Sequence, residues 1–177
     1  MDAIREEAGV SKPTLYNYYP GKEELFADVH RRFIGESLGD WLEGDDFPLP
    51  GSEEELRVIL LDFAESFVAA LLTQPERLAL VRVVIAETPR FPRLGELFRE
   101  ITIERAIALI SALLEQMDKR GLAEVEDSEA AARALIGPLV TYMFEEGLLV
   151  GEGGPRPPGP ERLEAAVDLF MKAIRKT

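Results

Sequence analysis

Glycine and proline divide this chain into segments of helical length, and that punctuation constrains the fold more than any other feature. The main breaks fall at Gly9, Pro20-Gly21, 44–52, Pro75, 88–92, Gly121 and 151–160. No segment shows a run of β-branched residues in period-two alternation. Between the breaks, apolar residues recur at helical spacing. The sequence therefore predicts an all-α fold.

Two short helices are predicted at the N-terminus. Residues 2–8 should form a helix that stops at Gly9, because glycine suits the left-handed conformation that closes helices. Ser11 offers an N-cap oxygen, and Pro13 lies in a first helical turn, where its missing N–H costs nothing. These residues predict a second short helix that ends before Pro20.

Longer helices are predicted after this pair from the spacing of apolar residues. They cover about 22–41, 52–73, 75–87, 92–121, 128–150 and 161–175. Ser52 and Glu55 form a capping-box pattern, and Asp127 can cap the helix that follows it. The final segment carries an apolar stripe at i, i+3, i+4, i+7, i+8 and i+11, which requires a packing partner.

The composition excludes several kinds of site. With no cysteine and a single histidine, the chain cannot form thiolate or histidine-cluster metal sites, and we expect neither metal nor cofactor. Nothing resembles a nucleophile with its base or a phosphate-cradling glycine loop, so an enzyme is not expected. No apolar run approaches the roughly 18 residues of a spanning helix, and no secretory signal is visible, which predicts a cytoplasmic location.

Charge is distributed unevenly along the sequence. The net charge of −13 would normally argue against a nucleic-acid partner, because phosphate binding depends on Lys and Arg. Residues 1–32, however, contain five basic and six acidic side chains. Nearly all the negative charge therefore lies after residue 32.

The first 22 residues have the outline of a helix-turn-helix, in which the second helix enters the DNA major groove. Ser11, Lys12, Thr14 and the neighbouring tyrosines place hydrogen-bond donors around the start of the short second helix. Such side chains contact phosphates and base edges.

The stretch IREEAGVSKPTLYNYYPGKEELF, residues 4–26, resembles the DNA-binding signature of the TetR family of bacterial transcriptional regulators. That signature reads roughly I-x-x-x-A-G-V-S-x-x-x-(L/I)-Y-x-(Y/H)-F-x-x-K-(E/D)-x-L. The residues in register are Ile4, Ala8, Gly9, Val10, Ser11, Leu15, Tyr16, Tyr18, Lys22, Glu23 and Leu25. Tyr19 replaces the common phenylalanine. The specific resemblance covers about the first 30 residues.

The resemblance implies two parts and a function. Residues 1–43 would form a truncated helix-turn-helix unit with its connecting helix, and residues 44–177 a helical effector-binding and dimerisation domain. The implied protein is a DNA-binding transcriptional regulator, most often a repressor, released from a palindromic operator by a small molecule. Ligand in the bundle would tilt the 22–43 helix. A homodimer would form through helices 128–150 and 161–175; alternatively, both helices pack within one chain.

The resemblance also implies a DNA-binding surface. Its residues would be Ser11, Lys12, Pro13, Thr14, Tyr16, Asn17, Tyr18 and Lys22. Tyr16, Tyr18 and Lys22 would bind phosphates. Asn17 is the candidate for reading a base edge, because an amide can both donate to and accept from adenine.

A mostly apolar ligand cavity is expected in the second part. Its candidate lining residues are Phe63, Phe67, Val81, Ile85, Phe98, Ile101, Thr102, Arg105 and Tyr142. The alternative for most of them is ordinary core packing. Arg105 interrupts an apolar stripe, which calls for an acidic partner or ligand; a salt bridge with Glu87 is the other interpretation.

Family members begin with a further helix, whereas here Met1 lies three residues before Ile4. Two alternatives stay open: residues precede this sequence in the natural protein, or it is a shortened member with impaired DNA binding. A rival function follows from the second, namely a dimeric ligand-binding or protein-interaction module without effective DNA binding.

Overall fold

The computed structural model describes residues 1–29, 32, 49–151 and 153–175, and within these ranges it contains helices and no strand. The elements are α1 (Asp2–Glu7), α2 (Lys12–Tyr18), α4 (Glu53–Leu72), α5 (Pro75–Glu87), α6 (Pro92–Phe98), η1 (Arg99–Glu104), α7 (Arg105–Lys119), α8 (Ser128–Met143), η2 (Phe144–Leu148) and α9 (Pro160–Ala173). Residues 22–29 are also helical. The all-α prediction is confirmed. The predicted boundary between residues 43 and 44 lies outside the described ranges.

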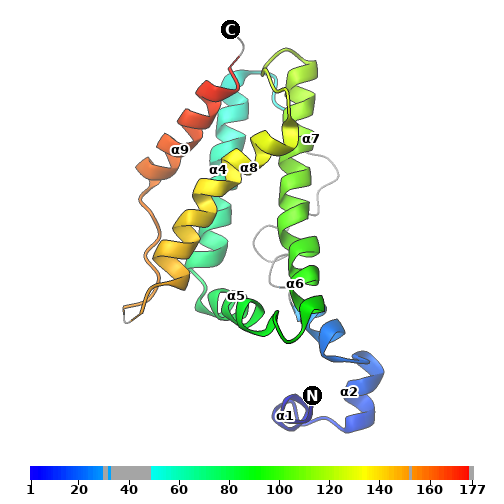
Figure 1. Cartoon of the computed structure of the whole chain (residues 1–177). Helices are drawn as coiled ribbons and strands as arrows, with labels where there is room; N and C mark the ends of the chain where they lie inside the picture. Colours follow the sequence, from blue (N-terminus) through cyan, green and yellow to red (C-terminus); the bar gives the residue numbers. More distant parts are fainter. Residues whose placement is uncertain (30–31, 33–48, 152, 176–177) are drawn as a thin grey trace.

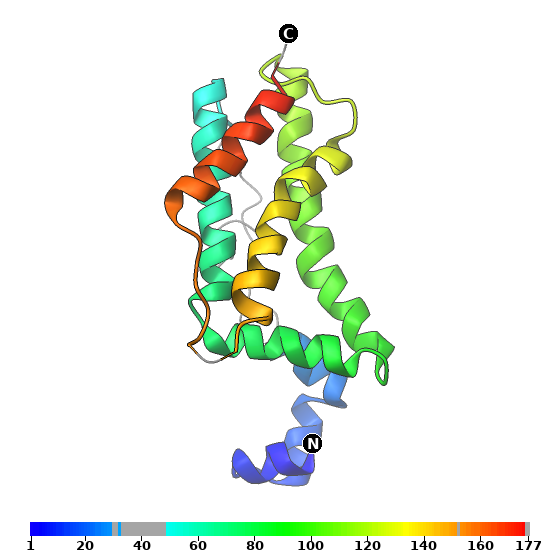
Figure 2. The ribbon, with the colours of Figure 1, turned by 60° about the vertical axis from the view of Figure 1, so that its left-hand side comes forward.

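A small N-terminal unit, residues 1–29, lies at one end of a larger helical bundle (Figure 1). In the bundle, α4, α7 and α8 run lengthwise and α9 packs beside α4, while α5 crosses the end nearest the N-terminal unit (Figure 2). The last described residues of α9 lie at the opposite end of the bundle. The N-terminal unit can therefore contact a partner without obstruction by most of the bundle.

Local backbone chemistry builds the N-terminal unit as the sequence predicted. Gly9 adopts φ +64°, and its N–H donates to the Glu6 carbonyl at 3.2 Å while the Val10 N–H donates to the Arg5 carbonyl at 3.2 Å. The Ser11 hydroxyl then accepts from the Thr14 N–H at 3.2 Å. A left-handed glycine and an N-cap serine thus set the turn between α1 and α2.

The same capping chemistry starts two helices of the bundle. The Ser52 hydroxyl accepts from the Glu55 N–H at 3.1 Å, and the Glu55 carboxylate accepts from the Gly51 N–H at 2.6 Å. Asp127 accepts from the Ala130 N–H at 2.9 Å. These contacts match the predicted starts of α4 and α8, with the Glu55 carboxylate reaching one residue further back than in a standard capping box.

The apolar face of α4 forms the centre of the core. Leu56, Leu60 and Phe63 are completely buried, together with Ile110 of α7 and Val167 of α9. The stripe on the final helix packs against α4 of the same chain. That stripe therefore finds its partner within one chain.

The segment from residue 92 is one continuous helical run, as predicted, and ends before Gly121, whose φ is +72°. Its middle, η1, is π-helical, a wider form that the sequence pattern did not predict. The α8 run likewise ends in a π-helical turn, η2, at Leu148. Arg82 donates to the carbonyls of Gly147 at 2.9 Å and Leu148 at 3.3 Å, which ties this end to α5.

An ion pair joins the outer sides of α4 and α9. The Arg57 Nε lies 2.6 Å from the Asp168 carboxylate, and both side chains are partly exposed. This hydrogen bond from Arg57 holds the pKa of Asp168 below its ordinary value of 3.8. The pair therefore favours the folded state only while Asp168 is ionised.

Replacing the cap of α8 should destabilise the bundle. We expect Asp127→Ala to lower the free energy of unfolding by about 1 kcal/mol, because the Ala130 N–H loses its acceptor. Asp127→Asn should remain close to wild type, since an amide oxygen also caps. Urea unfolding followed by circular dichroism measures both, and equal losses in the two variants would contradict the capping role.

Removing the ion pair should produce a pH-dependent loss of stability. At pH 7, Asp168→Asn should melt at a lower temperature than Glu65→Gln, which removes an exposed carboxylate of α4 and matches the charge change. Because the folded-state pKa of Asp168 is depressed, the deficit should be full above its ordinary pKa and vanish as the pH falls through the folded-state value. Thermal melts between pH 2.5 and pH 7 test this. A deficit independent of pH would refute the role of the pair.

Candidate functional site

The eight residues of the predicted DNA-binding surface are all solvent-exposed. Of the two tyrosines in this surface, Tyr18 is 76% exposed and Tyr16 is 39% exposed. Leu15, on the inner side of the same helix, is buried. Ile4 of α1 is 42% exposed. The short helix α2 therefore directs its polar and aromatic side chains outward and anchors itself through Leu15.

Two of the eight residues in this surface are lysines, Lys12 and Lys22. Lys12 Nζ lies 5.7 Å from the centroid of the Tyr16 ring and 3.8 Å from the Asp2 carboxylate. Lys22 Nζ lies 5.9 Å from the centroid of the Phe91 ring, in the turn between α5 and α6. Lys12 thus belongs to the α1–α2 surface, whereas Lys22 stands where the N-terminal unit meets the bundle.

Tyr19, the departure from the family signature, has a structural role. Its hydroxyl donates to the Asp28 carboxylate at 2.7 Å, and this bond raises the pKa of Tyr19. Asp28 belongs to the helical residues 22–29. The bond fastens the end of α2 to the next helix, which a phenylalanine could not do.

The N-terminal unit rests against α5 and α6. Tyr18, Tyr19 and Asp28 line one hollow together with Arg93 and Leu97 of α6. On the other side, Lys22 and Phe26 line a second hollow with Phe91, Leu94 and Val83. Residues of α6 therefore lie close to Tyr18 and Tyr19, at the end of α2.

A cavity of about 390 Å³ lies within the bundle, lined by residues of α4, α5, α6, η1, α7 and α8. Four of the nine predicted residues line it: Phe67, Val81, Phe98 and Thr102. Its volume falls in the range of small-molecule sites, and most of its lining is aliphatic or aromatic. The arrangement is suited to enclosing a small organic molecule.

The other five predicted residues lie outside the cavity lining. Phe63 is part of the core, with its ring centroid 6.0 Å from that of Phe67. Ile85 is 54% exposed, because the lining contributed by α5 ends one turn earlier, at Val81. Arg105 is exposed, and Ile101 and Tyr142 are partly buried. Helical spacing identified apolar residues but not which side of each helix faces the cavity.

Sequence reasoning missed two arginines of the lining, Arg77 of α5 and Arg133 of α8. Arg77 is only 4% exposed, and its Nη1 donates to the Ala70 carbonyl at 3.1 Å. One signal could have identified it. Arg77 precedes Val81 by four residues, which places both on one face of α5.

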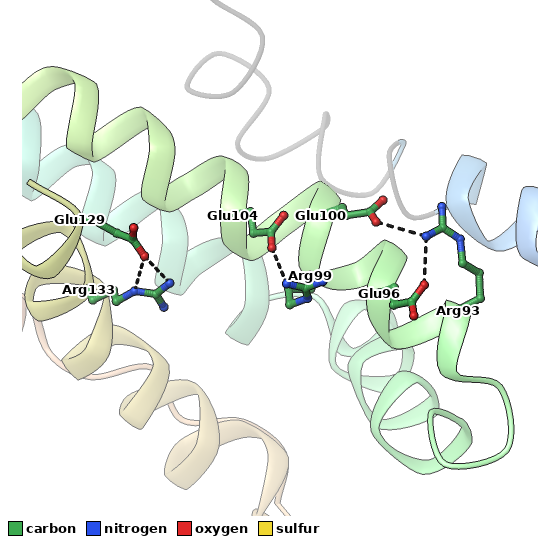
Figure 3. Close-up of polar contacts among 7 residues, drawn as sticks. All are labelled: Arg93, Glu96, Arg99, Glu100, Glu104, Glu129 and Arg133. Atoms are coloured by element: carbon green, nitrogen blue, oxygen red, sulfur yellow. Dashed lines mark hydrogen bonds and ion pairs between the residues drawn. The ribbon is translucent and has the colours of Figure 1, made fainter.

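Ion pairs follow one another along α6 and η1 (Figure 3). Arg93 lies 3.1 Å from Glu96 and 3.2 Å from Glu100, and Arg99 lies 2.6 Å from Glu104. The last pair is five residues apart, a spacing that the i to i+5 repeat of a π-helix brings onto one face. Exposed pairs contribute little stability individually, but these span the π-helical segment beside the cavity.

In the part of the chain that the structure describes, no helix combines the length and the apolar character needed to cross a membrane. No group of three or more His, Cys, Asp or Glu side chains there could hold a metal ion.

Two family models match the chain. Residues 59–175 match the C-terminal domain of the AefR-like transcriptional repressors, and residues 1–29 match the bacterial regulatory proteins of the tetR family. Uncharacterized HTH-type transcriptional regulators of Mycobacterium tuberculosis and Mycobacterium bovis are 27% identical over 169 residues, covering 95% of this chain and 73% of theirs.

Solved structures agree with these matches. The flavonoid-responsive regulator FrrA is 30% identical, with a TM-score of 0.70 over 99% of this chain and 86% of that one. A putative TetR-family regulator of Mesorhizobium loti is 28% identical, with a TM-score of 0.62 over 96% and 81%. Salmonella enterica GusR, at 18% identity and a TM-score of 0.62, shares the fold. Transcriptional regulators of this kind are generally not enzymes. The chain belongs to the TetR family of DNA-binding, dimeric transcriptional regulators.

Proposed function

We propose that this regulator is a repressor that leaves a palindromic operator when a small molecule fills the cavity of the bundle. The observation that carries the proposal is the continuous helical run from Pro92 to Lys119, which lines the cavity and also borders α2. FrrA is described as flavonoid-responsive, so a relative of this fold responds to an organic molecule. The protein would act in the cytoplasm, where operator DNA lies.

The exposed surface of α2 supports contact with DNA. The exposed hydroxyls of Tyr16 and Tyr18 could bind phosphates, as could the ammonium group of Lys22 at the start of the next helix. Asn17 offers an amide for a base edge. Ser11, Lys12, Pro13 and Thr14 complete the surface at the start of the helix. The bundle carries most of the excess negative charge, which would repel DNA everywhere except at this end.

The helical run offers a route between the two sites. Phe98 and Thr102 line the cavity, and Arg93 and Leu97, earlier in the same helical run, line the hollow beside Tyr18. A ligand that favours one position of α6 would therefore also favour one position of α2. The effector needs only to bind the DNA-incompetent arrangement more tightly than the competent one.

The outer faces of α8 and α9 support the proposed dimer interface. On α8 the exposed residues include Ala130, Ala134, Gly137 and Thr141, all small. Leu169, on the outer side of the adjacent α9, is 71% exposed. Small side chains let two helices approach closely, and an exposed leucine gains by burial. Two copies could thus form a four-helix interface here.

Operator binding should respond to single substitutions of the α2 region. With a duplex selected from random sequence, wild-type affinity should fall steeply with salt, and Lys22→Gln should reduce the slope of log K against log salt by about 1. Asn17→Ala should cost about 1–3 kcal/mol and relax preference at one base position. Fluorescence anisotropy between 50 mM and 200 mM salt measures both.

The matched control is Lys119→Gln, which removes the same charge from the exposed end of α7. Its salt slope should equal that of wild type. If the wild-type protein binds no duplex at modest salt, the DNA-binding proposal fails and the rival ligand-binding module is favoured. Equal salt slopes for Lys22→Gln and Lys119→Gln would show that Lys22 does not contact DNA.

The dimer should depend on Leu169. We expect Leu169→Arg to raise the dimer dissociation constant at least about tenfold, because a charge would have to be buried at the interface. The side chain is exposed within one chain, so secondary structure should be retained. Val58→Arg, at a 56% exposed position of α4, is the control and should remain dimeric. Sedimentation equilibrium measures the dimer dissociation constant of both variants. An unchanged constant in Leu169→Arg would show that the interface does not include Leu169.

A further inference from the structure

We infer that the cavity binds a single-chain amphiphile, with the alkyl chain inside the bundle and the polar head at a mouth between η1 and α8. This inference rests on the proposed function, because it names the chemical class of the effector. Three features of the cavity support it: the side on which it opens, the apolar character of its interior, and the balance of charge near the opening.

The cavity opens to solvent on one side. α8 packs against α7 but diverges from η1 as it runs toward α5 (Figures 1 and 2). Ile103 of η1 and Val140 of α8 both line the cavity, and they are 42% and 36% exposed. Gly137, three residues before Val140, also lines the cavity and is exposed. These residues therefore form a mouth between the two helices.

The mouth lies beside the proposed dimer face. Val140 directly precedes Thr141 of that face, and successive residues of an α-helix point about 100° apart. Ile103 belongs to η1, on the other side of the opening. A second copy packed on the small residues of α8 would therefore leave the Ile103 side of the mouth open to solvent.

Behind the mouth, the wall of the cavity is apolar. Its buried lining residues include Phe67, Val81, Ala106, Ile107 and Ile136. Among the lining residues that the structure describes, Arg77 is the only buried polar one. Its Nη1 donates to the Ala70 carbonyl at 3.1 Å, and its Nε and Nη2 are shut off from the cavity. The described part of the interior therefore presents apolar surface and no open charge to a ligand.

Such an interior favours an alkyl chain. Aliphatic side chains make up most of the lining, and Met143 adds a flexible one that adapts to a ligand. Each CH₂ group moved from water into this environment should improve affinity about fourfold. A polar group carried inside would lose its water partners and find few replacements. The volume of about 390 Å³ holds a chain of medium length, and the head remains at the mouth.

Charge near the mouth is balanced. Arg133 lies 2.7 Å from Glu129 on α8, and Arg99 lies 2.6 Å from Glu104 on η1 (Figure 3). Glu104 and Glu129 line one hollow together with Arg133, so the two pairs are neighbours. Because exposed ion pairs of this kind interact weakly in water, they should not select a head group by its charge. Anionic, neutral and cationic heads should all be accepted.

The first experiment measures how affinity depends on chain length and on the head group, by isothermal titration calorimetry without DNA. From 1-hexanol to 1-octanol, affinity should rise about fifteenfold, because two more CH₂ groups are buried. Decanoate, 1-decanol and decyltrimethylammonium should bind within about fivefold of one another. A cavity that is only a gap in the packing would show neither the rise with chain length nor this tolerance.

A charge placed at the mouth should create a head-group preference. Ile103→Lys should favour decanoate over decyltrimethylammonium by about threefold or more relative to wild type, because the new ammonium lies beside the head. Val83→Lys is the matched control, since Val83 is a 49% exposed residue of α5 outside this lining. It should keep the wild-type preference.

A side chain added inside the cavity should shorten the chain that fits. Ala106 is buried in the lining, so Ala106→Leu should end the gain in affinity at a shorter alcohol than in wild type. Ala79→Leu adds the same side chain at an exposed position of α5 outside the lining and should leave the series unchanged. Should Ala106→Leu not fold, the wild-type series and Ile103→Lys still decide.

Three results would overturn the inference: no binding of any chain, an affinity independent of chain length, or a head preference unaltered by Ile103→Lys. The proposed function is tested separately, by operator binding with and without a bound amphiphile. An amphiphile that binds in the cavity and leaves operator affinity unchanged would defeat the proposed release mechanism alone, so the two failures are distinguishable.

Discussion

The helical run from Pro92 to Lys119 is the constraint on which the rest of the arrangement depends. At one end, Arg93 and Leu97 line a hollow beside the N-terminal unit, the middle lines the cavity, and the far end contributes Ile110 and Met117 to the core. A helix transmits displacement along its length because its backbone hydrogen bonds resist local bending. The middle of the run is π-helical, a form that occurs mostly as short interruptions of α-helices and frequently at functional sites.

The distribution of charge complements this geometry. A body with a large excess of acid repels DNA, and the repulsion is weakest where acids and bases balance, in the first 32 residues. Lys12 lies over the ring of the exposed Tyr16 in α2, and Lys22 lies over Phe91, where the N-terminal unit meets the bundle. On the proposed function, this distribution would weaken non-specific contact along the bundle relative to contact at the N-terminal end. It would thereby favour one docking orientation over indiscriminate binding.

Sequence alone predicted elements whose chemistry is local. Gly9, Ser11, Ser52 and Asp127 set helix ends through bonds within a few residues, and each was identified from residue type and spacing. The π-helical turns and the cavity lining were not predicted, because they depend on how distant helices face one another. Arg77 is an example. Its side chain is buried where α5 follows α4 and bonds the Ala70 carbonyl, and hydrophobic periodicity along one helix does not predict such a contact.

The cavity and the proposed dimer face share α8, which would link the two parts of the proposed mechanism. Gly137 lines the cavity and is also solvent-exposed, and it lies in the row of small α8 residues that the proposed interface uses. At this point only α8 would separate a ligand in the cavity from the proposed second copy. Ligand contact that shifts α8 would alter the angle between two copies, and thereby the separation of the two α2 helices. Half-site spacing is fixed by the DNA repeat, so even a small change in that angle would weaken binding to a palindrome.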